Sequence, residues 1–320
     1  MACCAAGTTI CPERSGMPPC GSSEGFIMLA SEYRVDYSPE ETRNHIDFMR
    51  LKMGVRNIEF QPRAGRGLHA HLLPNADQCT VRTRCDFSIT PFVLVNHHWE
   101  VEQLLFARKA MERHNNVVVV DVGANIGLFS RQILGWLNNT HHLYAYEPEP
   151  ENFSCLMHNL GFFKNFTAQM VGLADHEGST TLHIDLSNCG NNSLVSDDLA
   201  GAWSKSAMEV RILDIVTESR RWLRHGLPIF YKSDTQGYDE FLASLLPDDV
   251  RAALIGGIIE IEQTEKPPFD IARFRSFLDS FEYKAILHPD ATEDPISTEQ
   301  TLDLLNSTAE AGSNIAFRRL

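Results

Sequence analysis

The sequence is short of basic residues. It has 28 lysines and arginines against 42 aspartates and glutamates, a formal net charge of −14. Residues 1–110 contain 12 of each kind, so residues 111–320 contain the remaining 16 basic and 30 acidic residues and hold the whole excess. An acidic body repels phosphate backbones and anionic lipid. We therefore expect neither nucleic acid nor a membrane surface among its partners.

Long apolar runs and paired cysteines are also missing. No stretch approaches the 18 consecutive apolar residues of a membrane span, and the first residues lack the basic and apolar regions of a secretory signal. The eight cysteines include no Cys-x-x-Cys spacing. These absences predict a cytoplasmic protein with reduced thiols. Asn-x-Ser/Thr sequons are interpreted as chance, because several fall inside expected helices and strands.

Composition and local pattern divide the chain into three parts. With 43% hydrophobic and 22% charged residues, the chain is globular in composition. Residues 1–25, rich in Gly, Ser, Pro and Cys, are expected to be a disordered tail. Residues 26–110 are mixed, with helices expected at 38–53 and 99–112 and a strand-like run at 87–95. They are predicted to be an N-terminal α+β extension that selects the substrate.

Residues 111–320 show strands alternating with helices. Val117–Asp121 is a continuous β-branched run, as expected of a strand covered on both faces. This pattern predicts βαβ units and a mainly parallel sheet, which is the α/β class. Further strands are expected at 142–147, 166–173, 180–184, 229–233, 254–261, 283–287 and 314–317, the last two as a possible antiparallel edge pair. Helices are expected at 128–137, 150–160, 238–246 and 271–281.

A glycine turn follows the first of these strands. The sequence Asp121-Val-Gly123-Ala-Asn125-Ile-Gly127 ends a strand in an acid and opens a helix. The glycines let the backbone approach a ligand closely. Their Gly-x-x-x-Gly spacing differs from the Gly-x-Gly-x-x-Gly fingerprint that cradles a pyrophosphate, and Asp121 would repel one. The acid suits a cationic group instead, such as the ammonium of an amino acid.

Two further acids follow later strands. Glu147 ends the second strand, where it can accept hydrogen bonds from two ribose hydroxyls, and Asp175 follows the third, where it can meet an adenine amino group. An ammonium site, a ribose site and an adenine site on consecutive strand ends describe S-adenosylmethionine. A simple helix-packing turn, as in any α/β protein, is the competing interpretation of the glycine turn, and these two acids disfavour it.

These segments resemble the FkbM family of S-adenosylmethionine-dependent methyltransferases over residues 116–262. The most specific piece is Lys232-Ser-Asp234-Thr-Gln-Gly-Tyr-Asp239. In the family, the last position of that piece is usually Glu, whereas this chain has Asp239. The other matching pieces are 121–127, 146–148, 172–178, 188–194 (which contains Ser193) and 213–214.

The resemblance implies a Rossmann-like, seven-stranded, mainly parallel sheet and methylation of a hydroxyl on a sugar, polyketide or similar small molecule. Gly123, Asn125, Gly127 and Ser193 are then expected to contact the cofactor, together with the acids named above. We expect residues 188–193 to form a lid. The acceptor and the oligomeric state are left open.

Methyl transfer to an alcohol needs help from a base or a metal. Asp234, at the end of its strand, is the predicted catalytic residue, as base or metal ligand, and Lys232 on the same strand face is expected to keep it ionised. A purely structural role of Asp234 in capping the turn is the competing interpretation. Glu260 and Glu262 share a strand face and could complete a Mg²⁺ site with Asp234. A polar strand end is the competing interpretation of those two glutamates.

Other candidates are weaker. Either histidine of the His97-His98 pair could act as a base, and Trp203 could contact the substrate. Because Asp239 departs from the family, a catalytically silent S-adenosylmethionine-binding or scaffold protein is the second hypothesis. An NAD-dependent oxidoreductase is the third, and the glycine spacing disfavours it.

Overall fold

The computed structural model describes residues 57–60, 80–86, 88–96, 98–186, 188–195, 205–261, 269–305 and 312–320. The tail expected at 1–25, the helix expected at 38–53, and His97, Trp203 and Glu262 lie outside the described residues. Within them, no helix is long and apolar enough to cross a membrane.

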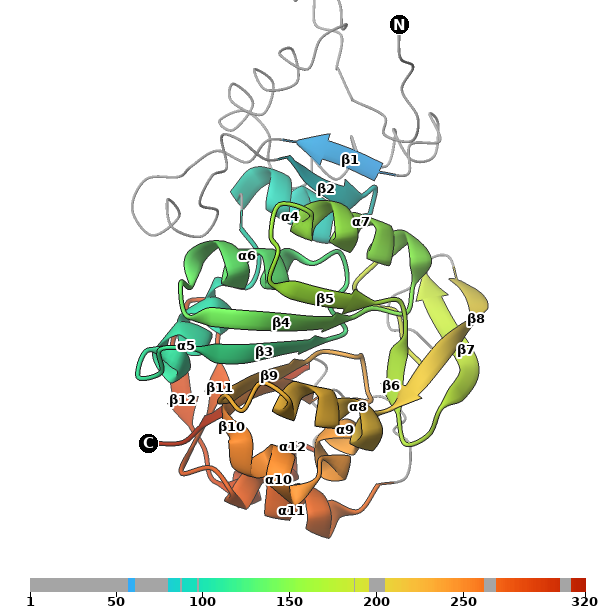
Figure 1. Cartoon of the computed structure of the whole chain (residues 1–320). Coiled ribbons are helices and arrows are strands. Elements are labelled where there is room, and N and C mark those ends of the chain that lie inside the picture. The colour runs from blue at the N-terminus through green and yellow to red at the C-terminus, as the bar shows by residue number, and fades with distance from the viewer. Residues whose placement is uncertain are drawn as a thin grey trace, which may run out of the picture.

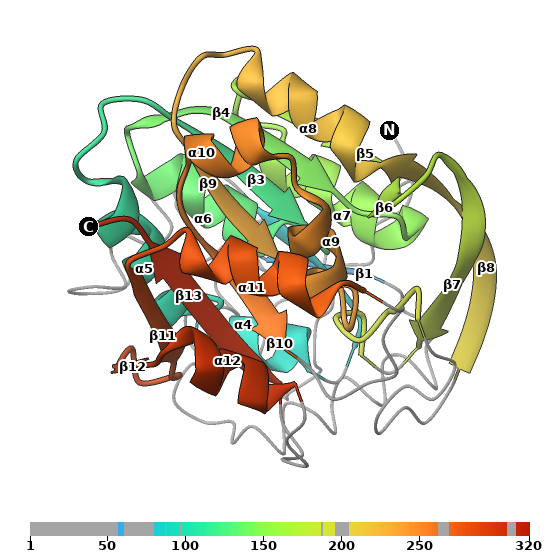
Figure 2. The ribbon, with the colours of Figure 1, turned by 90° about the horizontal axis from the view of Figure 1, so that it is seen from below.

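Eight strands form the central sheet, in the order β12-β11-β13-β10-β9-β3-β4-β5 (Figure 2). Five adjacent strands are parallel: β5 (Phe166–Gln169), β4 (Thr140–Tyr146), β3 (Val117–Val122), β9 (Ile229–Ser233) and β10 (Leu254–Ile261). The other three pair in antiparallel fashion: β13 (Ser313–Arg318), β11 (Tyr283–Leu287) and β12 (Glu293–Pro295). This confirms the α/β class with a Rossmann-like sheet; β12 is an eighth strand, added at the edge.

Helices cover both faces of the sheet, as the apolar β3 strand requires. Alternate valines of β3 contribute to two separate cores, one with α5–α7 and one with α8–α12 (Figure 1). The first group is α5 (Val101–Met111), α6 (Leu128–Trp136) and α7 (Pro150–Leu160). The second is α8 (Ile215–Leu223), α9 (Asp239–Leu245), α10 (Asp248–Ala253), α11 (Ile271–Asp279) and α12 (Thr298–Leu304).

Two small sheets flank the central one. β1 (Asn57–Phe60) and β2 (Val81–Arg84) form an antiparallel pair beside α7. β6 (Gly172–Ala174), β8 (Lys205–Asp214) and β7 (Gly178–Asp185) form a three-stranded sheet, drawn at the right of Figure 1. The single strand predicted at 166–173 is therefore wrong: the chain leaves the central sheet after Gln169 and enters the second sheet at Gly172.

The strand predicted at 87–95 is also wrong, because Ile89–Asn96 forms helix α4. Asp86 explains the difference. Its Oδ1 accepts hydrogen bonds from the backbone N–H groups of Ser88 (3.2 Å) and Thr90 (2.9 Å), which satisfies donors that a helix start leaves open. A wholly apolar run such as Phe-Val-Leu-Val cannot distinguish a buried helix from a buried strand.

Candidate functional site

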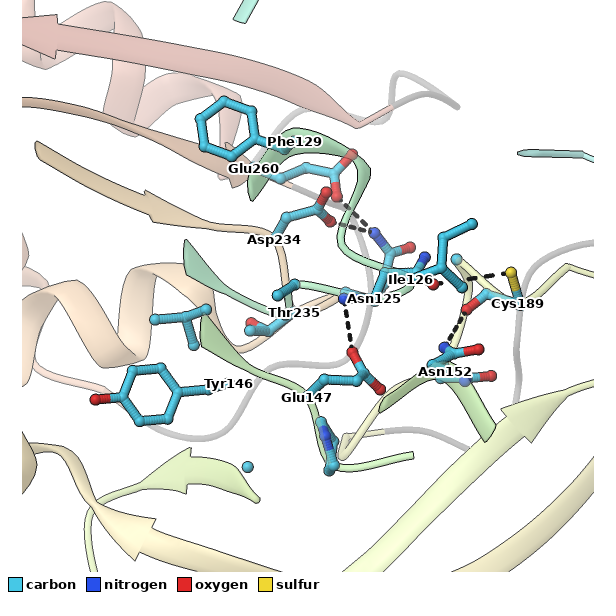
Figure 3. Close-up of a pocket in the computed structure, with 18 of the residues that line it drawn as sticks. Asn125, Ile126, Phe129, Tyr146, Glu147, Asn152, Cys189, Asp234, Thr235 and Glu260 are labelled. Carbon is cyan, nitrogen blue, oxygen red and sulfur yellow. Dashed lines mark hydrogen bonds between the residues drawn. The ribbon is translucent and has the colours of Figure 1, made fainter. Parts of the chain in front are cut away.

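A cavity of about 240 Å³ opens at the carboxyl ends of the parallel strands. It lies where the strand order reverses, since β4 and β5 follow β3 on one side while β9 and β10 lie on the other. Open α/β sheets bind ligands at this switch point. Figure 3 shows the cavity, with Glu147 at one end and Asp234 and Glu260 at the other. Its lining comes mainly from the turn after β3, the ends of β4, β9 and β10, residues 171–173, five residues of the 188–194 segment, and Ser88, Ile89, Trp99 and Glu100.

The glycine turn after β3 brings two strand ends together. Gly123 has a φ of +74°, and a Cβ added there would lie 1.9 Å from the backbone oxygen of Asp234. Its own N–H and that of Ala124 donate to the Tyr146 carbonyl. Only glycine therefore allows the β3 and β9 ends to approach this closely. Gly127 lies outside the cavity lining, with a φ of +78°, against Leu156.

Glu147 follows β4 and is 5% exposed. Its carboxylate accepts hydrogen bonds from the backbone N–H groups of Asn125 (2.8 Å) and Glu149 (2.9 Å). Burial raises the pKa of Glu147 to about 8. Two backbone donors fix the carboxylate in position and leave further lone pairs for a ligand that donates, as sugar hydroxyls do.

Asp121 lies outside the cavity lining. It is completely buried at the end of β3, where Oδ2 accepts a hydrogen bond from Ser130 Oγ at 2.6 Å and Oδ1 lies 3.9 Å from Lys232 Nζ. The structure thus gives the predicted cofactor residue an ionic partner from the protein itself. Its influence on a bound cation would act through Lys232 rather than by contact.

Lys232 lines the cavity and is the basic side chain around which the acids gather. Its Nζ lies 3.1 Å from Asp234, 3.9 Å from Asp121 and 4.0 Å from Glu100, and it faces the Phe129 ring. Burial opposes the ammonium charge, yet these carboxylates raise the pKa of Lys232. Among the described residues of the lining, Lys232 is the one basic side chain, against four acids: Glu100, Glu147, Asp234 and Glu260.

Asp234 and Glu260 share one hydrogen-bond donor. Gln236 Nε2 donates to Asp234 Oδ1 (2.9 Å) and to Glu260 Oε2 (2.7 Å), so an amide already lies between the two carboxylates. Burial disfavours the ionised form of Asp234, but the charge of Lys232 and the hydrogen bonds with Glu260, Gln236 and Lys232 together outweigh it and lower the pKa. The described part of the chain contains no group of three or more His, Cys, Asp or Glu side chains that could hold a metal ion. The geometry gives the predicted Mg²⁺ site no support.

Like Asp121 and Gly127, the predicted cofactor residues Ser193 and Asp175 lie outside the lining. Ser193 is buried, and its Oγ donates to the Gln236 carbonyl at 2.7 Å, which ties the 188–194 segment to the β9 end. Asp175 has a side chain 54% exposed and pairs with His176. Asn192, from the predicted 188–193 lid, does line the cavity, and its buried Nδ2 has no hydrogen-bond partner within the described residues.

Asp239, which departs from the FkbM pattern, also lies outside the cavity lining. It is completely buried, and its carboxylate accepts hydrogen bonds from Ser233 Oγ (2.5 Å) and the Thr235 N–H (3.1 Å). Burial raises its pKa to about 6. The residue holds the loop after β9 in place, so the departure from Glu concerns the support of the site rather than its lining.

The histidine candidates lie away from the cavity lining. His98 packs edge-on against Phe92, with ring centroids 5.6 Å apart. His141 and His142 contact His225 beside the start of β4, at the opposite end of that strand from Glu147. The described residues therefore give histidine no place at the site.

Trp99 and Glu100 are lining residues that the sequence did not single out. The buried Gln132 amide holds this segment from both sides: Trp99 N–H donates to Gln132 Oε1 (3.1 Å), and Gln132 Nε2 donates to the Trp99 carbonyl (3.0 Å). Glu100 begins α5 with a φ of +46°. The left-handed region is uncommon for a residue with a side chain, and such strain often marks functional sites.

Fold and site together define an α/β protein with a Rossmann-like sheet and an acid-rich cavity at its switch point. No family model and no curated protein matches the chain. Solved structures similar to it include methyltransferase FkbM from Methylobacillus flagellatus, with 14% identity and a TM-score of 0.39. The match covers 72% of this chain and 53% of that one.

Two others are precorrin-6y C5,15-methyltransferase from Geobacter metallireducens and M. jannaschii TYW2 in complex with AdoMet. The first has 13% identity and a TM-score of 0.32, covering 69% of this chain and 88% of that one. The second has 14% identity and a TM-score of 0.32, and the match covers 76% of this chain and 83% of that one. These likenesses are too distant to carry an argument about function, which must come from the site.

Proposed function

We propose that the chain is an S-adenosylmethionine-dependent methyltransferase that methylates a hydroxyl of a small molecule. The observation that carries the proposal is the buried Glu147 carboxylate, held by backbone donors in a cavity at the switch point of the sheet. Such a carboxylate suits the paired hydroxyls of a ribose. The turn at Gly123, beside it, leaves room for the amino-acid part of the cofactor.

The charge balance of the cavity supports a cationic cofactor. Four acids face one lysine in the lining, and completely buried Asp121 adds a fifth carboxylate behind Lys232. A sulfonium bound there would favour the ionised form of these acids and be stabilised by it, whereas a diphosphate would disfavour their ionisation and be repelled. The same balance disfavours NAD, as the glycine spacing does.

The acceptor would lie on the side of the cavity formed by Trp99, Glu100, Lys232 and Asp234. Two of these residues and two more lining residues, Ser88 and Ile89, precede residue 110, in the region proposed to select the substrate. An aromatic ring beside carboxylates suits a hydroxylated ring compound. With its pKa lowered by Lys232, Asp234 is a weak base, and we assign it to orienting the acceptor hydroxyl.

A silent S-adenosylmethionine-binding protein is the alternative. This hypothesis rests on the departure of Asp239 from the family pattern, but Asp239 supports the loop after β9 and does not line the cavity. The two hypotheses share the cofactor site and differ in turnover. Release of S-adenosylhomocysteine in the presence of hydroxylated compounds separates them.

Calorimetric titration with S-adenosylmethionine tests the cofactor site. Glu147→Gln keeps the shape but replaces one acceptor oxygen by an NH₂ group, which cannot accept from a hydroxyl, so its affinity should fall by about 10- to 100-fold, or roughly 1.5–3 kcal/mol. Glu149→Gln is the matched control: it alters a buried acid two residues away that caps α7 and lies outside the lining. It should lower stability and leave affinity unchanged. Equal affinity in wild type and Glu147→Gln would contradict the assignment.

A further inference from the structure

Glu100 lies in the cavity without an assigned role. It comes from the start of α5, its side chain is 18% exposed, and its backbone adopts the left-handed conformation. The Gln132 amide fixes Trp99, the residue before Glu100, by hydrogen bonds with both its backbone N–H and its carbonyl. The protein therefore holds a carboxyl group at the cavity in a conformation that ordinary helix starts do not require.

Glu100 is surrounded by charges from several elements: Lys232 and Asp234 at the end of β9, Asp121 from β3, Glu102 from its own helix, and Glu260 of β10 in the same lining. Burial raises the pKa of Glu100 to about 8, with Asp234 adding to the effect and Lys232 opposing it. At neutral pH the free protein therefore holds Glu100 mainly in its protonated form. Any additional positive charge nearby would favour loss of that proton.

Resting on the proposed function, we propose that Glu100 is the residue by which the cavity distinguishes the cationic methyl donor from its neutral product. Binding of the sulfonium expels the Glu100 proton, and the ionised carboxylate then holds the donor. The thioether product carries no sulfur charge, so Glu100 recovers its proton and the product is held less tightly.

The order of residues along the sheet edge supports this assignment. Glu147 follows β4, Gly123 follows β3, and Asp234 follows β9, and these three strands are adjacent. The donor's sulfur joins its ribose to its amino-acid part, so with the ribose at Glu147 and the amino-acid part at Gly123 the sulfur lies between these two residues. For transfer its methyl group must face the acceptor side of the cavity, which Trp99, Glu100, Lys232 and Asp234 line. Glu100, 4.0 Å from Lys232 Nζ, borders that end of the cavity.

The same ionisation would serve the transfer step. The acceptor oxygen forms a bond to the methyl carbon, the carbon–sulfur bond breaks with its electron pair going to sulfur, and the hydroxyl proton passes to the Glu100 carboxylate. The step ends with a methyl ether, a neutral thioether and a protonated Glu100. A base is then available only while the donor is bound.

Proton release on binding tests the inference without an acceptor. Calorimetry at pH 7 in two buffers of different ionisation enthalpy measures the protons released by S-adenosylmethionine and by S-adenosylhomocysteine. Glu147 faces the ribose that both ligands share, so its contribution cancels in the difference. We expect wild type to release about one proton more with the sulfonium than with the thioether.

Glu100→Gln should abolish that difference and lower the preference for S-adenosylmethionine over S-adenosylhomocysteine by about tenfold. Glu102→Gln is the matched control, because Glu102 is on the same helix with a pKa also raised by burial but lies outside the lining. Glu100→Asp keeps a carboxyl group should the amide variant fold poorly, and it should retain proton release.

The outcomes are distinct. Failure of wild type to bind either ligand would overturn the proposed function and this inference with it. Binding of both ligands with an unchanged proton difference in Glu100→Gln would overturn the inference alone. An unchanged ligand preference in that variant would do the same.

Discussion

The two ends of the cavity are built by different interactions. At the β4 end, backbone N–H groups hold the Glu147 carboxylate in place. At the β9 end, the Lys232 ammonium lies among the acidic side chains of Asp234, Asp121 and Glu100. Backbone donors fix a group without adding another titratable charge, whereas an ion-pair cluster changes with every proton and every charged ligand. The first end suits a constant cofactor group, and the second suits the site where charge changes during reaction.

Removing Lys232 should disrupt the β9 end of the cavity and destabilise the protein. Lys232→Met leaves the buried Asp121 and the half-buried Asp234 and Glu100 without their cation, and loss of one partner from a buried ionic cluster destabilises proteins by about 3–5 kcal/mol. Urea denaturation measures the free energy of unfolding. Lys109→Met is the control, because Lys109 is an exposed lysine paired with Glu293, and its loss should change stability by about 1 kcal/mol or less. Equal effects of the two variants would contradict the cluster.

The pH dependence of stability sharpens the comparison. Glu100 and Glu147 both have pKa values of about 8 in the folded protein, above the 4.5 of an exposed glutamate. Between these values the folded state binds more protons than the unfolded state, so their contribution to the free energy of unfolding falls as pH rises from about 5 to 8. In Glu100→Gln or Glu147→Gln, that fall should be smaller by about 1 kcal/mol or more.

Unfolding curves at pH 5 and pH 8 provide the measurement, with Glu102→Gln and Glu149→Gln as references. If the free energy of unfolding falls with pH as steeply in both cavity variants as in wild type, neither carboxyl group has a raised pKa. If the fall is smaller in only one variant, only the carboxyl group replaced in that variant has a raised pKa.

The smallest expected effect on the cavity comes from restoring the family residue. Asp239→Glu adds a methylene to a completely buried side chain and should destabilise the protein by about 1–3 kcal/mol. Because Asp239 does not line the cavity, S-adenosylmethionine affinity should stay within about twofold of wild type when measured on folded protein. A large change in affinity would place Asp239 in the functional site after all.

Much of the sheet could be predicted because its strands are continuous apolar runs with clear ends. The predicted bounds of β9, β10, β11 and α7 match the structure. β8 (Lys205–Asp214) was missed because it is not a continuous apolar run: charged residues alternate with the buried Val210 and Ile212, which is the pattern of a strand with one exposed face. Helix α4 was missed because the residue that caps it, Asp86, precedes an apolar run that reads equally well as a strand.

The residues of the site also differ in whether the sequence could predict them. Glu147 could be predicted because it ends a strand beside a glycine turn, and local sequence fixes both features. Glu100 could not, since its neighbours Lys232 and Asp234 come from a distant strand and only the tertiary fold brings them together. The sequence also could not show that Asp121 would be paired with Lys232 behind the lining.

Mass spectrometry of S-adenosylhomocysteine release tests the central claim most directly. The full chain is incubated with S-adenosylmethionine and a panel of hydroxylated small molecules, and each mixture is examined for the thioether and for an acceptor heavier by one CH₂ unit. The account predicts equal amounts of both products with at least one compound, and their loss in Glu147→Gln. Binding of S-adenosylmethionine without release of the thioether from any compound would contradict it.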